Sequence, residues 1–315
     1  MPQGAAVRKR VPPLCRRNWL IVLYEFVEDE FELRNEFSTA KVSPWGATLT
    51  HLVINGKTVI SHATKSDVKN SFAGVTLAPW PNRLAGAAWQ LDGKKLSAKV
   101  NDHSQHSSGG NANHGLVFDR RFEIKNQTSS QVTFTISLGD DEVYPFEVAI
   151  DVSYELIGTE LLASISAKNN GSKIAPVAFG THPYLAIAAD SKIKISAALQ
   201  AVNDSAQIPT GWEPAVKQIA ETYAQLKLDD CFAGLETDAN GIAQTTITNA
   251  DGSQVAVWQD ALFKYLMIYT HPSLGVAIEP QTSPANAFNS GEDLIWLEPA
   301  EAVTGRWGIR VGSEK

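Results

Sequence analysis

Residues 146–168 read FEVAIDVSYELIGTELLASISAK, and this stretch predicts the fold more directly than any other part of the chain. Apolar and polar residues alternate from Phe146 to Leu156, which is the period of a strand with one buried face. Gly158 and Thr159 then turn the chain into a second run, residues 161–168. Because such a short turn joins antiparallel neighbours, the stretch predicts a β-hairpin.

The same pattern recurs on both sides of this hairpin. An Asn-Gly pair at 55–56 and Asp-Gly pairs at 92–93 and 251–252 separate short runs rich in Val, Ile, Thr and aromatic residues. Such pairs favour two-residue hairpin turns, because these turns need residues that tolerate a positive φ. The chain therefore predicts an all-β fold, a large antiparallel β-sandwich with little helix.

Three segments do not fit the strand pattern. Residues 72–83, FAGVTLAPWPNR, hold two prolines two positions apart, where a central strand cannot continue, and they predict a surface loop. Pro209, Gly211 and Pro214 predict a second loop. Residues 101–115 are rich in Ser, Gly, Asn and His, and we interpret them as either a disordered excursion or a binding loop.

The length of 315 residues is compatible with one large β-domain, since no repeat of fixed period or long linker divides the chain. We expect this domain to cover residues 27–315. Residues 1–26 combine basic clusters with the apolar run 19–24, as a signal peptide does, but no small-residue cleavage site follows. We interpret them as a poorly ordered basic tail or an upstream extension of the reading frame.

The charge balance and the cysteines limit the partners and the compartment. The chain has 34 acidic and 27 basic residues, whereas nucleic acids and anionic membranes favour a basic surface. The two cysteines, Cys15 and Cys231, are too few for a disulfide framework and indicate a reducing compartment. We therefore expect a cytoplasmic protein with no nucleic-acid partner and no membrane partner.

Two ionisable residues stand at the ends of apolar runs. His182 lies in APVAFGTHPYL (175–185), and imidazole readily gives or takes a proton near neutral pH. Glu279 closes the apolar strand 275–278, where burial would raise its pKa toward the value that a general base needs. Each has a plainer alternative: a histidine that bonds its own turn, and a solvated glutamate at a strand end.

Other polar and aromatic side chains stand where strands end. Arg83 offers a fork of donors that suits hydroxyls or a carboxylate, and Asp229 offers acceptors. The plainer alternatives are a surface cation beside Asn82 and an acidic turn at Asp229 and Asp230. Trp80, between two prolines, either presents a flat face to a sugar ring or plugs the mouth of the sandwich.

The sequence does not predict a metal site or a covalent nucleophile. His103, His106 and His114 have no compact ligand spacing, and neither an HExxH motif nor a cysteine pair accompanies them. There is no Gly-x-Ser-x-Gly elbow and no glycine-rich phosphate cradle after a strand. We therefore expect neither a metal nor a cofactor.

Five motifs occur together and give the chain a family resemblance. They are APWPNRLAG (78–86), NHGL (113–116), GTHPYL (180–185), LDDCF (228–232) and IEPQTSPANAF (278–288). In this order they resemble the aldose 1-epimerase (galactose mutarotase) family, from about Phe31 to the C-terminus. Five motifs in register are specific for the family but not for the sugar.

The resemblance implies a galactose mutarotase-like sandwich and a cofactor-free isomerase that interconverts the α and β anomers of a free aldohexose. It implies that Glu279 is the base that takes the anomeric proton and that His182 is the acid that protonates the ring oxygen. It implies that His114 holds and polarises the same oxygens. The residues that it implies for sugar binding are Arg83 and Asp229, with Asn82 alongside.

Alternatives to this function remain at the level of the sequence. The WPNR form is similar to a branch that includes sulfoquinovose mutarotases, and Asp230 stands where the family commonly has histidine, so the substrate could be an anionic hexose or a hexose 6-phosphate. The phosphate should need extra cations beyond Arg83. A non-catalytic carbohydrate-binding module would not need both His182 and Glu279. A glycoside hydrolase would need two carboxylates and would leave His182 idle. We expect a monomer or a weak homodimer that binds a small-molecule sugar.

Overall fold

The computed structural model describes residues 29–102, 110–215 and 222–313, and the expected tail at residues 1–26 lies outside them. Strands dominate this part of the chain, and every pairing between its strands is antiparallel. The all-β antiparallel fold predicted from the sequence is therefore confirmed.

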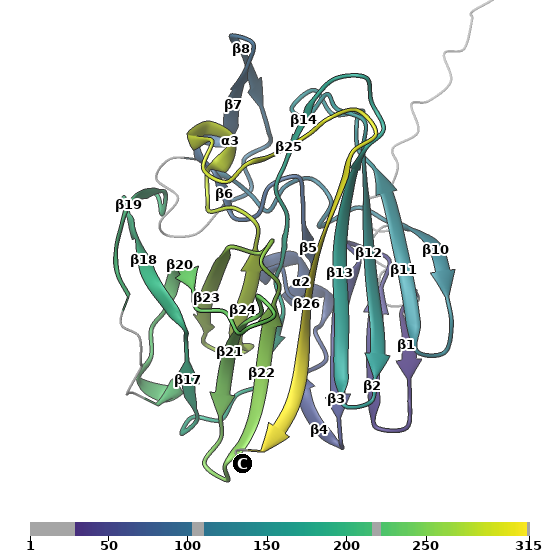
Figure 1. Cartoon of the computed structure of the whole chain (residues 1–315), viewed down its shortest axis with the longest axis vertical. Coiled ribbons are helices and arrows are strands. Elements are labelled where there is room, and N and C mark those ends of the chain that lie inside the picture. The colour runs from purple at the N-terminus through teal and green to yellow at the C-terminus, as the bar shows by residue number, and fades with distance from the viewer. Residues whose placement is uncertain (1–28, 103–109, 216–221, 314–315) are drawn as a thin grey trace, which may run out of the picture.

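Eight strands form what we call the large sheet, which Figure 1 shows side by side from β10 at one edge through β26 toward β21. In spatial order they are β10 (Glu123–Gln127), β11 (Gln131–Ser137), β12 (Val148–Ile157), β13 (Glu160–Asn169), β26 (Ala302–Ser313), β22 (Ser253–Gln259), β21 (Ala243–Thr248) and β17 (Lys192–Lys194). The hairpin predicted at residues 146–168 is β12 and β13, and its buried residues alternate along both strands.

A second group of eight strands, which we call the site sheet, carries the candidate active site. Its order is β19 (Pro209–Pro214), β18 (Ala197–Asn203), β20 (Asp229–Leu235), β23 (Tyr265–His271), β24 (Gly275–Gln281), β15 (Gly180–Thr181) and β5 (Thr76–Leu77), with β16 (Tyr184–Leu185) also paired to β24. The sheet therefore brings together segments that lie far apart in the sequence.

The remaining strands form smaller sheets. Four pair in chain order: β1 (Phe31–Arg34), β2 (Ser38–Ser43), β3 (Thr48–Ile54) and β4 (Lys57–Ile60). Three two-stranded ladders join β6 (Arg83–Leu84) to β9 (Ala112–Asn113), β7 (Ala88–Leu91) to β8 (Lys94–Ser97), and β14 (Ala175–Val177) to β25 (Ile295–Leu297). The predicted turns at 55–56, 92–93 and 251–252 join β3 to β4, β7 to β8 and β21 to β22.

Two predictions of loops are wrong. Residues 73–83 are buried rather than on the surface, because they run between the sheets and contribute β5 and the start of β6. Residues 209–214 form β19 rather than a loop. Prolines are tolerated there because β19 is the edge strand of the site sheet, so one side of the strand needs no ladder hydrogen bonds.

Helices are short in the described part of the chain. They are α2 (Lys65–Ser71), α3 (Ala287–Ser290) and two 3₁₀ turns, Ala85–Ala87 and Tyr223–Gln225. A capping box starts α2: Thr64 Oγ1 accepts from the Asp67 N–H, and the Asp67 side chain accepts from the Thr64 N–H. Phe72 ends the helix in the left-handed conformation, with φ 53°, which turns the chain toward the site sheet.

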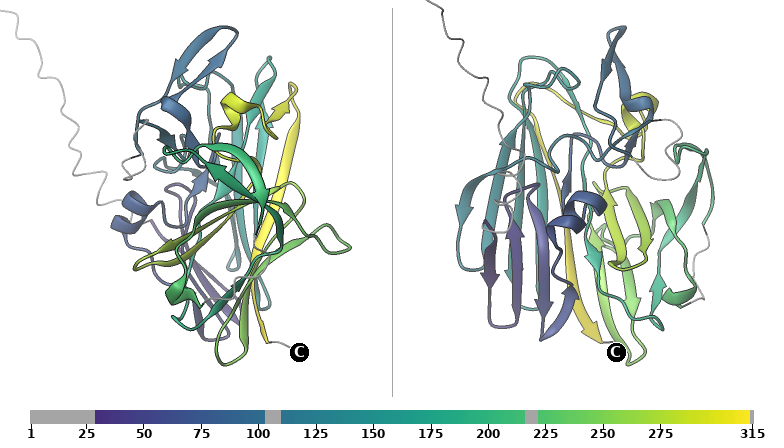
Figure 2. Two further views of the ribbon diagram at one scale, coloured as in Figure 1. Left: turned by 90° about the vertical axis from the view of Figure 1, so that its left-hand side faces the viewer. Right: turned by 180° about the vertical axis from the view of Figure 1, so that it is seen from behind.

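One continuous cluster of buried side chains unites the sheets. It includes Leu33 of β1, Ile150 of β12 and Ile278 of β24, each of which is 0% exposed. Seen from behind in Figure 2, α2 lies between the four-stranded sheet and the site sheet. None of the helices among the described residues has the length and apolar character to cross a membrane.

Candidate active site

One face of the site sheet carries a cleft of about 1110 Å³. The strand register explains why polar residues meet there: Asp229 pairs with Tyr269 on β23, and Met267 of β23 pairs with Glu279 on β24. Paired residues, and residues two apart in one strand, point to the same face of a sheet. The floor of the cleft therefore collects side chains from β20, β23 and β24.

Glu279 lies inside β24, so the prediction that the strand closes at this residue is wrong. The strand continues through Pro280 to Gln281. Pro280 has no N–H to donate to a neighbouring strand. It is tolerated because it lies in the gap between Ala277, which pairs with β16, and Gln281, which pairs with β15. The carboxyl group is thus fixed by sheet on both sides rather than by a loose strand end.

The surroundings of Glu279 make its carboxyl group a strong base. The residue is 2% exposed, and Gln281 Nε2 donates to its Oε2 at 3.1 Å. Burial first, and then the negative charge of Asp229, raise the pKa of Glu279 well above its ordinary value; the Gln281 hydrogen bond and Arg83 oppose these effects. A carboxylate with a raised pKa accepts a proton more readily than an ordinary glutamate.

His182 lies between β15 and β16, at the bottom of the cleft. Its N–H donates to the Val75 carbonyl at 3.1 Å, and its carbonyl accepts from the Gly74 N–H at 2.8 Å. The residue is 5% exposed, and burial lowers the pKa of its imidazole to about 3. These contacts fix the backbone of His182, and its ring packs against Tyr184 with centroids 5.0 Å apart.

The side chains of His182 and Glu279 meet. His182 Nε2 lies 3.3 Å from Glu279 Oε1. Burial favours the uncharged forms, a carboxylic acid beside a neutral imidazole, and the contact offers a path for that proton to move to the imidazole and leave an ion pair. Such a pair can accept a proton at one group and supply a proton at the other with no change in its total charge.

His114 lies at the wall of the cleft in the left-handed conformation, with φ 64°. Its Nδ1 accepts the Asn82 N–H at 3.3 Å, so a neutral His114 carries its proton on Nε2. Burial, followed by the charges of His182 and Arg83, lowers the pKa of His114 well below its ordinary value. The ring packs against Phe72 with centroids 4.5 Å apart. His114 is therefore a fixed neutral donor.

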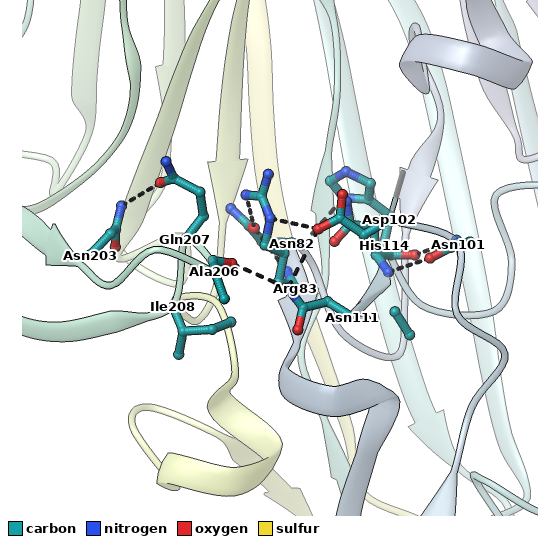
Figure 3. Close-up of polar contacts among 12 residues, drawn as sticks. Asn82, Arg83, Asn101, Asp102, Asn111, His114, Asn203, Ala206, Gln207 and Ile208 are labelled. Atoms are coloured by element: carbon teal, nitrogen blue, oxygen red, sulfur yellow. Dashed lines mark hydrogen bonds and ion pairs between the residues drawn. The ribbon is translucent and has the colours of Figure 1, made fainter. Parts of the chain in front are cut away.

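Arg83 and Asn82 follow the WP segment and line the same cleft. Asn82 Oδ1 accepts from the Arg83 N–H at 2.8 Å and from Arg83 Nη1 at 3.3 Å. Asp102 Oδ2 accepts from Arg83 Nε at 3.1 Å, as Figure 3 shows. The guanidinium is thus buried and held by two neighbours.

Asp229 and Asp230 have different surroundings. Asp229 is the first residue of β20 and lines the cleft, where its charge acts on Glu279. Asp230 points to the neighbouring strand, where Gln200 Nε2 donates to its Oδ1 at 3.0 Å. Asp230 therefore supports the sheet rather than lining the cleft.

Trp80 is placed apart from the other predicted site residues. Its side chain is 2% exposed and packs against Phe288, with ring centroids 5.6 Å apart. The residues that line the cleft do not include it. Trp80 therefore packs inside the sandwich as a plug, which is one of the two alternatives that the sequence left open; the other was a flat platform for a sugar ring.

Several residues in or beside the cleft were not predicted from the sequence. Phe72 and Tyr184 pack against the imidazole rings, Gln281 bonds Glu279, and Asp102 bonds Arg83. Tyr184 and Gln281 stand within the GTHPYL and IEPQTSPANAF motifs, so proximity to His182 and Glu279 in the sequence was the available signal. Nothing in the local sequence pointed to Asp102.

Among the described residues no group of three or more His, Cys, Asp or Glu side chains is arranged to hold a metal ion. His103 and His106 lie outside those residues. The described cleft holds a carboxyl group beside an imidazole, with neutral and cationic donors around them.

Buried acid and base groups in a cleft on an antiparallel sandwich are suited to proton transfer on a polar ligand. Comparison with known proteins specifies the class of the protein. Residues 29–310 match the family model described as aldose 1-epimerase. The chain therefore belongs to the aldose 1-epimerase family, as its five motifs predict, and is an isomerase that acts on carbohydrates.

Individual relatives agree with this assignment. An uncharacterized protein, YihR of Escherichia coli, is 31% identical over 80% of this chain and 83% of its own length. The galactose mutarotases of Sus scrofa and Homo sapiens are each 27% identical, over 58% of this chain and 56% of their own length. The chain thus matches little more than half the length of these two curated mutarotases.

A solved structure shows the same fold. The galactose mutarotase-like protein from Clostridium acetobutylicum superimposes with a TM-score of 0.78 at 21% identity, over 90% of this chain and 95% of that protein. The predicted galactose mutarotase-like sandwich is therefore confirmed.

Proposed function

We propose that this protein is an aldose 1-epimerase that interconverts the α and β anomers of a free aldohexose without a cofactor. The observation that carries the proposal is the 3.3 Å contact between His182 Nε2 and Glu279 Oε1, buried at the bottom of the cleft. Mutarotation needs one proton removed and one supplied, and this pair offers both groups to the same hemiacetal.

The reaction follows from the proton that the pair shares. Sugar hydroxyls that donate to Glu279 stabilise its carboxylate, which favours the form with the proton on His182. Glu279 then takes the anomeric proton while His182 protonates the ring oxygen, and the bond between C1 and that oxygen breaks. After rotation about the C1–C2 bond, His182 takes the proton of the C5 hydroxyl and Glu279 returns its proton to the aldehyde oxygen. The pair ends as it began.

The walls of the cleft supply the contacts that hold the sugar. His114, as a neutral Nε2–H donor, suits the oxygens whose charge changes during ring opening. Arg83 offers donors and Asp229 offers acceptors, which together suit neighbouring hydroxyls. Positioned acid and base groups typically contribute about 10²- to 10⁴-fold each to the rate.

The charges around the cleft favour a neutral sugar. The Arg83 guanidinium is paired with the Asp102 carboxylate, and Asp229 lies in the same cleft. An anionic hexose is the second candidate, because Lys69 and Lys227 line the cleft and are exposed. The two candidates differ in which substrate is turned over faster.

The test is anomer exchange measured by polarimetry or by NMR on freshly dissolved α-glucose and α-galactose, with buffer blanks. Glucose 6-phosphate and sulfoquinovose are measured alongside them. Faster exchange of the neutral sugars supports the proposal. Faster exchange of an anionic hexose transfers the assignment to the second candidate, and tight sugar binding with no exchange would make the protein a carbohydrate-binding module.

A further inference from the structure

Arg83 is held from two sides by neighbouring residues. Asp102 Oδ2 accepts from its Nε at 3.1 Å, and Asn82 Oδ1 accepts from its Nη1 at 3.3 Å. The side chains of Arg83 and Asp102 are 10% and 1% exposed, so this ion pair is largely buried. Because a guanidinium has five N–H donors, these contacts leave donors for a ligand in the cleft.

Asp102 is itself fixed by Asn111. The Asp102 N–H donates to the Asn111 carbonyl at 3.2 Å, and Asn111 Nδ2 lies 3.5 Å from Asp102 Oδ2. The same Nδ2 donates to the Ala206 carbonyl at 3.2 Å, and Asn111 Oδ1 accepts from the Gly86 N–H at 3.1 Å. Figure 3 shows this chain of contacts running from Arg83 to the turn between β18 and β19.

A second set of contacts fixes the distance between the segments that carry the two charges. The Asn113 N–H donates to Asn101 Oδ1 at 2.6 Å, and Asn101 Nδ2 donates back to the Asn113 carbonyl at 3.1 Å. Asn113 pairs with Arg83 across β6 and β9. The backbone beside Asp102 is thus tied to the residue opposite Arg83, which leaves the carboxylate little freedom relative to the guanidinium.

We propose that Asp102 is a positioning and specificity-determining residue, which fixes the direction of the Arg83 guanidinium and balances its charge. Arg83 then binds hydroxyl oxygens of a neutral sugar, whereas an unbalanced guanidinium would bind an anionic group. This inference deepens the proposed function and rests on it. Direction and charge are separable, because asparagine at position 102 keeps an acceptor oxygen but removes the charge, and alanine removes both.

The experiment compares Asp102→Ala, Asp102→Asn and wild type, with Asp141→Asn as the matched control. Asp141 accepts two hydrogen bonds of 2.7 Å from Arg120 in a pair that does not line the described cleft. Asp102→Ala should raise KM for a neutral aldohexose about tenfold and change kcat less than about threefold, because it weakens binding in the ground state and transition state alike. Asp141→Asn should change neither constant.

Asp102→Asn tests the balance of charge. It should raise the ratio of kcat/KM for glucose 6-phosphate to that for glucose about tenfold above the wild-type ratio, because the guanidinium is no longer neutralised. An unchanged ratio overturns the specificity part of the proposal. Because the amide keeps the acceptor and the volume of the side chain, this variant also serves where Asp102→Ala does not fold.

A double-mutant cycle with Arg83→Ala separates positioning from general damage to the structure. If Asp102 acts through Arg83, Asp102→Ala should have no further effect on KM once Arg83 is alanine. An equal effect in both backgrounds overturns the proposal. The same cycle can be measured as calorimetric Kd values for the aldohexose, which need no turnover. A wild type that binds the sugar but does not exchange anomers would refute the proposed function, and the Kd values would still show whether Asp102 acts through Arg83.

Discussion

Replacing Glu279 with glutamine should slow anomer exchange by orders of magnitude and, as the pH rises above 4.5, make the folded protein more stable than the wild type. Glutamine has nearly the same volume. Its amide oxygen can accept from Gln281 Nε2, now 3.1 Å from Glu279 Oε2, and its amide N–H can donate to His182 Nε2, now 3.3 Å from Glu279 Oε1. The variant therefore keeps both contacts and removes a buried titratable group.

The magnitude follows from the raised pKa of Glu279. In the unfolded chain this carboxyl group ionises once the pH rises above its ordinary pKa of 4.5. In the folded protein it keeps its proton to a higher pH. The resulting stability is fully present below pH 4.5 and is lost as pH rises, by about 1.4 kcal/mol per pH unit until the folded pKa is reached. Glutamine does not ionise and so avoids this loss, and its advantage in the free energy of unfolding should be smallest at pH 5 and larger at pH 8.

The assay is urea unfolding of both proteins at pH 5 and pH 8, together with polarimetric rates. Activity should fall by about 10²- to 10⁴-fold, the usual contribution of a general base. Glu123→Gln is the control, because Glu123 is an exposed residue of β10. A glutamine variant at position 279 that exchanges anomers at the wild-type rate, or that is no more stable than wild type at pH 8, would refute the reasoning.

Further predictions concern the acid, the core and one glycine. Since the pKa of His182 is lowered to about 3, kcat/KM should stay level from about pH 7 down to about pH 5 and fall only in stronger acid; a midpoint near 6.5 in the pH-rate profile would contradict this. Trp80→Phe should cost about 1–3 kcal/mol in urea unfolding, because the indole packs on Phe288, and should leave KM unchanged; an increased KM would assign Trp80 to the sugar site. Gly115→Ala should cost at least about 3 kcal/mol, because φ is +76° and the new Cβ would lie 2.0 Å from the Ala78 carbonyl oxygen; a variant as stable as wild type would show that this turn relaxes.

Much of the fold could be predicted because its determinants are local. The hairpin of β12 and β13 needs alternation along two strands and a turn at Gly158, all within one stretch of sequence. The candidate site was likewise visible as motifs, and His182, Glu279, His114, Arg83 and Asn82, together with Asp229, line one cleft.

The remainder depends on partners that the local sequence does not name. The burial of residues 73–83 requires sheets on both sides, and β19 can contain prolines because it lies at an edge. Trp80 is flanked by prolines in either interpretation, and only its packing against Phe288 assigns it to the core. Asp102 lies in a polar stretch that is typical of a loop, and only its ion pair with Arg83 in the structure shows its role.

The groups proposed to transfer protons and the groups proposed to select the sugar lie in different kinds of structure. Glu279 is embedded in a strand paired on both sides, and the backbone of His182 is bonded to Gly74 and Val75, whereas Arg83 takes its setting from a connecting segment and a hairpin turn. Under the proposed function, a substitution at Asp102 should therefore change which hexose is preferred and leave the ring-opening step itself unchanged.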